Sequence, residues 1–242
     1  HRVDRRQRQM CIRDRDSEFV LPIHCGTEIG VASTKAFLGQ ILILYLLALK
    51  LALLRKDIEK IHFDKKIDDL KNLPKLIEQT LLIDNKIQTI SNIFNEAKGS
   101  MFLGRGFSYP IALEGSLKLK ELSYIHAEGY PAGEMKHGPL ALIEEGMPVV
   151  VLAPRDNYYK KTISNMQEVI ARGAKVLLIT NKSKDEIISE NIWETIEVES
   201  TNEDLLPFLL TIPLQKLAYY SALKKGYDID KPRNLAKSVT VE

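Results

Sequence analysis

Short apolar runs alternate with longer amphipathic segments over the second half of the chain. The runs have the length and composition of buried strands and lie at Met101–Leu103, Val149–Leu152 and Lys175–Ile179, with a weaker one at Thr195–Val198. The spacing of apolar residues predicts helices between them, at Ile111–Tyr124, Asn157–Arg172 and Leu205–Lys225. Alternating strands and helices predict an α/β fold, with a doubly wound parallel sheet flanked by helices.

The first part of the chain has a different pattern. Phe19–Ile23 is an apolar run that predicts a strand, and a long helix is expected at about Ser33–Arg55. That helix is apolar enough to raise the question of a membrane span. Gln40 and Lys50 interrupt it and it begins in a polar turn, so we expect no membrane partner. The pattern favours burial in a core or in a subunit interface.

Amphipathic segments between residues 56 and 98 predict a helical connector. Asp64–Leu73 has apolar residues at helical spacing, Pro74 is expected to start the next helix, and Ile87–Phe94 forms another. Each segment is charged on one face and apolar on the other. We therefore expect these helices to cover another layer of the fold.

Composition excludes several classes of protein. The 242 residues are 45% apolar and 27% charged, which is ordinary for a globular chain with a large core. The net charge of +2 comes from residues 1–16, with six Arg and three Asp; the remainder holds 28 basic and 29 acidic residues. We expect no nucleic-acid partner. Cys11 and Cys25 lack ligand spacing, so we expect no metal site and a reducing, cytoplasmic location.

Residues 1–16 differ from the rest of the chain. They are rich in Arg and Gln, lack periodicity, and contain no apolar stretch of the kind found in signal peptides. The pattern changes abruptly at Ser17. We expect residues 1–16 to be an extension that is not native to the fold, or a disordered basic tail.

The stretch from Leu103 to Ala141 concentrates the candidate chemistry. A strand, the turn Gly104-Arg105-Gly106 and a helix follow one another, and such glycines let a backbone approach a ligand while the helix start favours anions. Ligands of open α/β sheets lie at the carboxyl ends of strands, where this turn is expected.

Ionisable side chains follow that turn. Lys118 and Glu121 lie three apart on the expected helix and so share a face. The next segment is predicted to be irregular, and it holds Glu128, Glu134, Lys136 and His137. Such a density of acids, amines and an imidazole is typical of a reaction site. Taken singly, the Lys118–Glu121 pair fits a solvated ion pair and His137 fits a structural histidine.

Three separated motifs carry a family resemblance. They are KLKELSYIHAEGYPAGEMKHGPLAL at residues 118–142, GTEIGVASTKAF at 26–37 and DKPRNLAKSVTVE at 230–242. In their order along the chain they resemble the isomerase part of the glutamine–fructose-6-phosphate aminotransferases, also called glucosamine-6-phosphate synthases. The similarity runs from about Ser17 to the end of the chain.

The resemblance implies a fold built from two sugar-isomerase (SIS) subdomains. Residues 17–98 would be the C-terminal, helical remnant of a truncated first subdomain with its connector, 99–228 the second subdomain, and 229–242 an active-site tail. It further implies that a first sheet, a Ser- and Thr-rich phosphate loop and a glutaminase domain are missing. We therefore expect the chain to be inactive alone.

The resemblance also implies the chemistry: fructose 6-phosphate and glutamine-derived ammonia give glucosamine 6-phosphate, in amino-sugar biosynthesis, with no cofactor. Glu121 matches the family's base, which moves a proton between adjacent carbons, and Lys118 matches a lysine beside it. His137 matches the histidine of ring opening, which a neighbouring subunit supplies, so a homodimer is implied. Lys237 matches a lysine that can form a Schiff base; alternatively it belongs to a frayed tail.

Further positions match residues that line the family's sugar site. These are Val31, Ser33 and Ala236. Ser33 is alternatively the N-cap of the long helix. Glu134 and Lys136 are expected to be structural.

A competing interpretation belongs to another class of protein. It is a non-catalytic SIS module that binds a sugar phosphate and regulates a partner. The presence of both Glu121 and Lys237 favours the enzyme, because a regulator needs neither.

Overall fold

The structure is a computed structural model, and it describes residues 18–183 and 191–236. The predictions for residues 1–16 lie outside the described part of the chain. The described residues form two compact units. A smaller unit holds residues 18–28 and 33–63, and a larger unit holds 29–32 with everything from 64 onward.

The smaller unit contains one long helix, α2 (Lys35–Leu54), which confirms the predicted helix. The carboxylate of Glu28 accepts hydrogen bonds from the backbone N–H groups of Thr34 at 2.7 Å and Ala36 at 3.4 Å. A negative charge at this end complements the helix dipole. The residue at the N-cap is Thr34, so the alternative assignment of Ser33 as the N-cap is wrong.

α2 is largely exposed within this chain. Leu49 is its buried residue, whereas Leu44 and Leu54 are each 65% exposed. Among the described residues, α2 is the one helix long and apolar enough to cross a membrane. The predicted burial in a core of this chain is therefore wrong, and burial in a subunit interface stays a prediction.

Phe19–Ile23 does not form a strand, contrary to the prediction. A strand needs a neighbour for its backbone hydrogen bonds. The strands that the structure describes pair only with one another, in one sheet that begins at Gly99. Phe19 is 83% exposed and Leu21 is 57% exposed, so the run has no apolar partner either.

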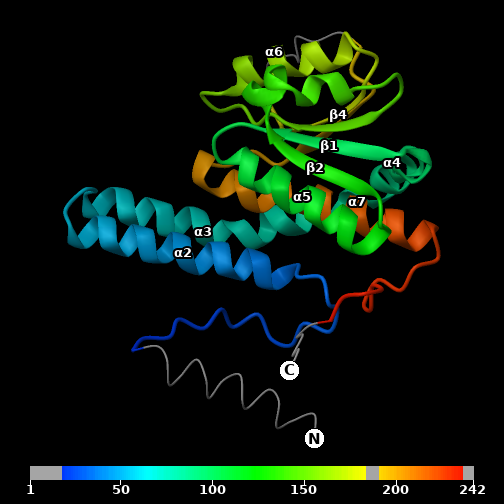
Figure 1. Cartoon of the computed structure of the whole chain (residues 1–242). Coiled ribbons are helices and arrows are strands. Elements are labelled where there is room, and N and C mark those ends of the chain that lie inside the picture. The colour runs from blue at the N-terminus through cyan, green and yellow to red at the C-terminus, as the bar shows by residue number, and fades with distance from the viewer. Residues whose placement is uncertain (1–17, 184–190, 237–242) are drawn as a thin grey trace, which may run out of the picture. The chain divides into compact units, whose positions relative to one another are not determined.

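The larger unit is a parallel sheet with helices on both faces (Figure 1). Its described strands are β1 (Gly99–Gly104), β2 (His126–Pro131), β3 (Pro148–Leu152), β4 (Lys175–Asn181) and β5 (Glu194–Val198). They lie in the order β2-β1-β3-β4-β5, and every neighbouring pair is parallel. The predicted doubly wound α/β fold is confirmed, as are the four predicted strands.

Helices cover both faces of this sheet. α5 (Ser108–Ser123) and α7 (Leu206–Lys224) lie on one face, and α6 (Tyr159–Ile170) lies on the other (Figure 1). The remaining elements are α3 (Lys60–Thr80), α4 (Asp84–Glu96) and the short 3-10 segments η1 (Leu81–Ile83), η2 (Ala132–His137), η3 (Pro139–Leu142) and η4 (Glu203–Leu205). Gly115 lets α5 approach its neighbours, since a Cβ there would lie 2.7 Å from Leu214 of α7 and 3.1 Å from Phe102 of β1.

β2 lies in a segment that was predicted to be irregular, and that prediction is wrong. Its sequence, His-Ala-Glu-Gly-Tyr-Pro, contains no apolar run. As an edge strand it pairs on one side with β1. Gly129 packs so closely on α5 that a Cβ would lie 2.9 Å from Leu113, so small residues take the place of the apolar ones that usually mark a strand.

α3 continues through Pro74, where a helix boundary was predicted. A proline inside a helix removes one N–H donor and disturbs the preceding turn. Leu73, beside it, is only 5% exposed, and this burial favours the continuous helix. The predicted boundary is wrong.

Candidate functional site

α5 carries a buried cluster of three ionisable side chains. Lys118 Nζ donates to Glu121 Oε2 at 2.5 Å and lies 3.6 Å from Glu114 Oε1. Spacings of three and four residues place all three on one helix face. The side chains of Lys118 and Glu114 are 3% and 8% exposed, and that of Glu121 is 23% exposed. The alternative of a solvated surface pair is therefore wrong.

Glu114 is a member of this cluster that sequence reasoning missed. Its Oε1 atom is buried and accepts no hydrogen bond from the described residues. Burial raises the pKa of Glu114 to about 7; Lys118 opposes the rise and the charge of Glu121 adds to it. A carboxyl group that titrates near neutral pH can hold or accept a proton during a reaction. Its position four residues before Lys118 was the available signal.

The raised pKa of Glu114 predicts a pH-dependent difference in stability. The pKa rises from its ordinary value of 4.5 to about 7 in the folded protein, so the folded state binds this proton more tightly. The stability that Glu114 contributes therefore falls as pH rises from about 4.5 to about 7. A Glu114→Gln variant lacks this titration, and its urea midpoint is expected to rise relative to the wild type over that range.

The measurement is urea unfolding of both proteins at several pH values, with Glu96→Gln as the control because Glu96 is exposed on α4. If the difference between the urea midpoints of wild type and Glu114→Gln stays constant from about pH 4 to pH 8, Glu114 has no such pKa shift.

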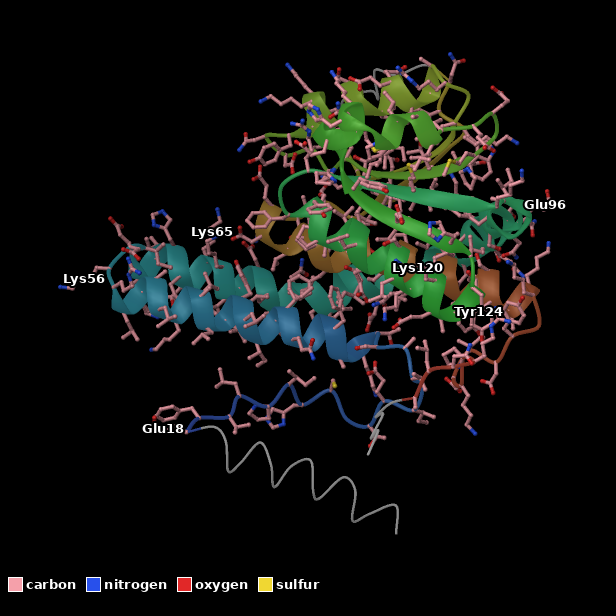
Figure 2. The ribbon with its side chains drawn as sticks, in the orientation of Figure 1. Glu18, Lys56, Lys65, Glu96, Lys120 and Tyr124 are labelled. Carbon is pink, nitrogen blue, oxygen red and sulfur yellow. The ribbon has the colours of Figure 1, made fainter. Side chains whose placement is uncertain are left out.

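A cavity of about 510 Å³ opens beside Glu121, and we call it the α5 cavity. Its lining residues are Leu117, Lys120 and Glu121 on α5, Tyr124 and Ile125 directly after α5, His126 at the start of β2, and Arg233, Asn234 and Leu235 near the C-terminal end. Figure 2 labels Lys120 on the last turn of α5 and Tyr124 at the end of this helix. The cavity thus joins the ion cluster to a segment more than a hundred residues away in the sequence.

Two of the predicted substrate-binding residues belong to the same part of the larger unit. The backbone N–H of Val31 donates to the carbonyl oxygen of Asp230 at 2.9 Å. Val31 is therefore hydrogen-bonded to the segment Tyr227–Leu235, which we call the C-terminal segment. Ala236 directly follows Leu235 of the cavity lining. Lys237 lies outside the described residues.

His137 does not line the α5 cavity of its own chain. It lies on η2, with its side chain 76% exposed and its Nε2 3.9 Å from Glu134 Oε2. Lys136 pairs with Glu168 at 3.1 Å, a contact that is compatible with the structural role expected for it. Ser33, the remaining predicted residue, belongs to the smaller unit.

The Gly104-Arg105-Gly106 turn packs on the protein itself. A Cβ at Gly104 would collide with the backbone of Ser108 at the start of α5. Gly106 has a φ of +52°, and a Cβ there would lie 2.7 Å from the ring of Tyr158. Arg105 Nε donates to Asn165 Oδ1 at 3.1 Å. Internal packing accounts for these glycines, and the expected approach of a ligand to this turn stays a prediction.

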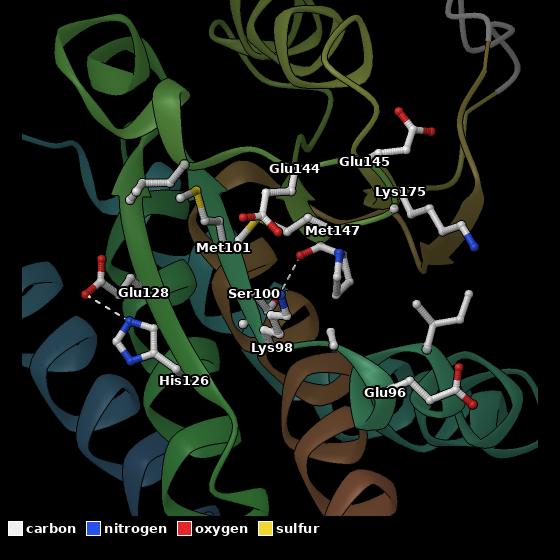
Figure 3. A pocket seen from close by; sticks show the side chains of 16 residues that line it. Glu96, Lys98, Ser100, Met101, His126, Glu128, Glu144, Glu145, Met147 and Lys175 are labelled. Atoms are coloured by element: carbon white, nitrogen blue, oxygen red, sulfur yellow. Dashed lines mark hydrogen bonds and ion pairs between the residues drawn. The ribbon is translucent and has the colours of Figure 1, made fainter.

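A larger cavity of about 620 Å³ lies at the amino ends of β1 to β4 (Figure 3). Its charged or titratable lining residues are Glu96, Lys98, His126, Glu128, Glu144, Glu145 and Lys175. His126 Nε2 lies 3.4 Å from Glu128 Oε1, yet the two side chains are 73% and 42% exposed. Tyr130 donates a hydrogen bond to Glu128, which raises the pKa of Tyr130 to about 12. Exposed groups suit proton transfer less well than the buried cluster, so the α5 cavity is the better candidate site.

Comparisons with known proteins agree with this fold. Residues 93–225 match the SIS domain family. The chain is 50% identical over 228 residues to a Bartonella henselae protein named glutamine–fructose-6-phosphate aminotransferase [isomerizing], a match that covers 94% of this chain and 38% of the relative.

Solved structures show the same likeness. The C-terminal domain of glucosamine-fructose-6-phosphate aminotransferase from Francisella tularensis is similar with a TM-score of 0.82 and 45% identity, over 85% of this chain and 58% of that one. A glucosamine-6-phosphate deaminase from Thermotoga maritima has a TM-score of 0.64 and 26% identity, over 89% of this chain and 59% of that one. The chain thus spans less than two thirds of each of these proteins.

Proposed function

Because the chain belongs to the SIS domain family, we propose that it is the isomerase part of a glutamine–fructose-6-phosphate aminotransferase. The whole protein would make glucosamine 6-phosphate from fructose 6-phosphate and glutamine-derived ammonia, for amino-sugar biosynthesis. The observation that carries the proposal is the buried Glu114–Lys118–Glu121 cluster beside the α5 cavity. A volume of about 510 Å³ is within the usual range of small-molecule sites.

The cluster suits the proton transfer that this reaction requires. Ammonia condenses with the C2 carbonyl of the open-chain sugar and water is lost. Glu121 then takes a proton from C1 and a proton is returned to C2, while the C1 hydroxyl loses its proton and the imine nitrogen gains one. This leaves an aldehyde at C1 and an amine at C2. The Lys118 ammonium, 2.5 Å from Glu121, stabilises negative charge that develops on the sugar oxygen. Glu114, with its pKa raised to about 7, is able to hold the proton that Lys118 or Glu121 exchanges.

We assign His137 to ring opening in the α5 cavity of a second copy of the chain, so that the working form is a homodimer. Ring opening needs a group that can both give and take a proton, which an imidazole can do. The exposed position of His137 on η2, away from the lining of its own α5 cavity, supports a role in another copy.

The other site residues have supporting roles in this proposal. Val31, Ser33 and Ala236 would bind the sugar phosphate. Lys237 would first form a Schiff base at C2 with loss of water, and ammonia would then displace the lysine amine to give the imine described above. The hydrogen bond between Val31 and Asp230 of the C-terminal segment supports the proposal that Val31 and Ala236 belong to one site. A cytoplasmic location is supported by the free thiol of Cys25.

The test is turnover by a chain extended at its N-terminus with the segment that its aminotransferase relatives carry. We expect the extended chain to isomerise fructose 6-phosphate, and the 242-residue chain to bind this sugar weakly in calorimetry. A folded, extended chain without turnover would count against the enzyme. If that chain bound the sugar tightly but did not convert it, the regulatory module would be the correct assignment.

A further inference from the structure

Tyr124 stands at the end of α5 in a conformation that tyrosine rarely adopts. It is the C-cap residue, with φ 59° and ψ 20°, and its N–H donates to Lys120 O at 3.2 Å. The left-handed position after a helix is usually filled by glycine, which has no Cβ to strain. A tyrosine in this strained backbone conformation must be stabilised by the contacts of its side chain. Residues of this kind concentrate at functional sites.

The side chain of Tyr124 contacts both ends of the C-terminal segment. Its hydroxyl oxygen accepts a hydrogen bond from the backbone N–H of Arg233 at 2.7 Å. The guanidinium of Arg233 lies over the Tyr124 ring, 4.2 Å from its centroid, and the ring of Tyr227 lies 4.6 Å away on an inclined plane. One side chain thus makes a hydrogen bond, a cation–π contact and an aromatic contact.

The segment from Tyr227 to Leu235 has a defined internal structure. The carboxylate of Asp228 accepts hydrogen bonds from the backbone N–H groups of Asp230 at 2.9 Å and Lys231 at 3.0 Å. This arrangement is an Asx turn, in which a side chain replaces a backbone acceptor. The same segment accepts the hydrogen bond from Val31. The C-terminal segment therefore connects α7 to the α5 cavity in a defined conformation.

We propose that Tyr124 is a positioning residue, which fixes the C-terminal segment against the end of α5 and so holds the part of the α5 cavity that this segment lines. The inference rests on the proposed function, in which this cavity takes the sugar phosphate. Glu121 lies one helical turn before Tyr124, and both line the cavity. Arg233, Asn234 and Leu235 of the C-terminal segment line the same cavity. The hydroxyl of Tyr124 joins the two sets of lining residues directly, through the backbone N–H of Arg233.

Two variants separate this role from a general effect on folding. Tyr124→Phe keeps the ring and removes the acceptor for the Arg233 N–H. Tyr124→Gly removes every side-chain contact and suits the left-handed backbone, so α5 is expected to keep its structure. Tyr158→Phe is the matched control, because Tyr158 packs under Gly106 and does not line the α5 cavity.

The first measurement is hydrogen exchange in the 242-residue chain. In Tyr124→Phe the Arg233 amide is expected to exchange about threefold to tenfold faster, as the loss of one ordinary hydrogen bond implies. In Tyr124→Gly the faster exchange is expected to extend over residues 228–236, while the amides of α5 stay protected. Unchanged protection of this segment in both variants would overturn the proposal, whatever the extended chain does in turnover.

The second measurement is steady-state kinetics of the N-terminally extended chain with fructose 6-phosphate. Tyr124→Gly is expected to raise KM severalfold, with a smaller change in kcat, because Glu121 is left in place. Faster exchange combined with an unchanged KM would show that the segment does not shape the site, and would overturn the positioning role. If the wild-type extended chain has no turnover, the proposed function fails, and the exchange result alone decides whether Tyr124 holds the segment.

Discussion

Glu121→Gln is expected to lower the turnover of the N-terminally extended chain by about 10²–10⁴-fold, the usual contribution of a general acid–base group. Glutamine has the size of glutamate and can still accept a hydrogen bond from Lys118, but it cannot take a proton from C1. Binding of fructose 6-phosphate should therefore change little. The measurements are steady-state turnover and calorimetric titration with the sugar.

The control for this variant is Glu96→Gln, which changes a carboxylate of the other, larger cavity. It should leave turnover unchanged. Comparable losses in the two variants, or full activity in Glu121→Gln, would remove Glu121 from the reaction and return it to a structural ion pair.

Lys118→Met is expected to lower the free energy of unfolding by about 3–5 kcal/mol, as the loss of one partner from a buried ion pair does. Lys118 is 3% exposed and lies between two carboxyl groups, so its removal leaves Glu114 and Glu121 without a counter-charge. The measurement is urea unfolding of the 242-residue chain at neutral pH. A Glu114→Gln/Lys118→Met double variant should recover part of the loss, because one of the two carboxylates is then neutral.

Lys71→Met is the matched control for this prediction. Lys71 also pairs with an acid three residues away, Asp68, but both side chains are more than 70% exposed. Exposed pairs contribute about 0–1 kcal/mol, so the control should unfold almost like the wild type. A Lys118→Met variant as stable as Lys71→Met would show that the ion cluster on α5 is not a buried network.

The strands could be predicted from the sequence where burial requires a run of apolar residues. β1, β3 and β4 contain apolar runs because they are buried along nearly their whole length, whereas the edge strand β5 alternates and buries only Ile196 and Val198. β2 has no such apolar run, because it is an edge strand whose inward-facing positions are the small residues Ala127 and Gly129. The false strand at Phe19–Ile23 has the opposite cause: the run is apolar, but no described strand lies beside it to pair with.

The candidate site was predictable only in part. Helical spacing brings Lys118 and Glu121 together, and the same rule applied once more would have added Glu114. The burial that raises the pKa of Glu114 is a tertiary property, which spacing does not report. The contact between Tyr124 and Arg233 joins positions more than a hundred residues apart, and local pattern carries no information about it. Motif resemblance alone pointed to the C-terminal segment.

The central claim is that the α5 cavity, and not the larger cavity at the amino ends of the strands, takes the reacting sugar. The most direct measurement is a crystal structure of the N-terminally extended chain with fructose 6-phosphate bound. We predict the C1–C2 end of the sugar within hydrogen-bonding reach of Glu121, roughly 2.6–3.2 Å, with the segment that ends at Leu235 beside it. A sugar bound instead against Glu128 and Glu144 in the larger cavity, with Glu121 in contact only with Lys118, would contradict the claim.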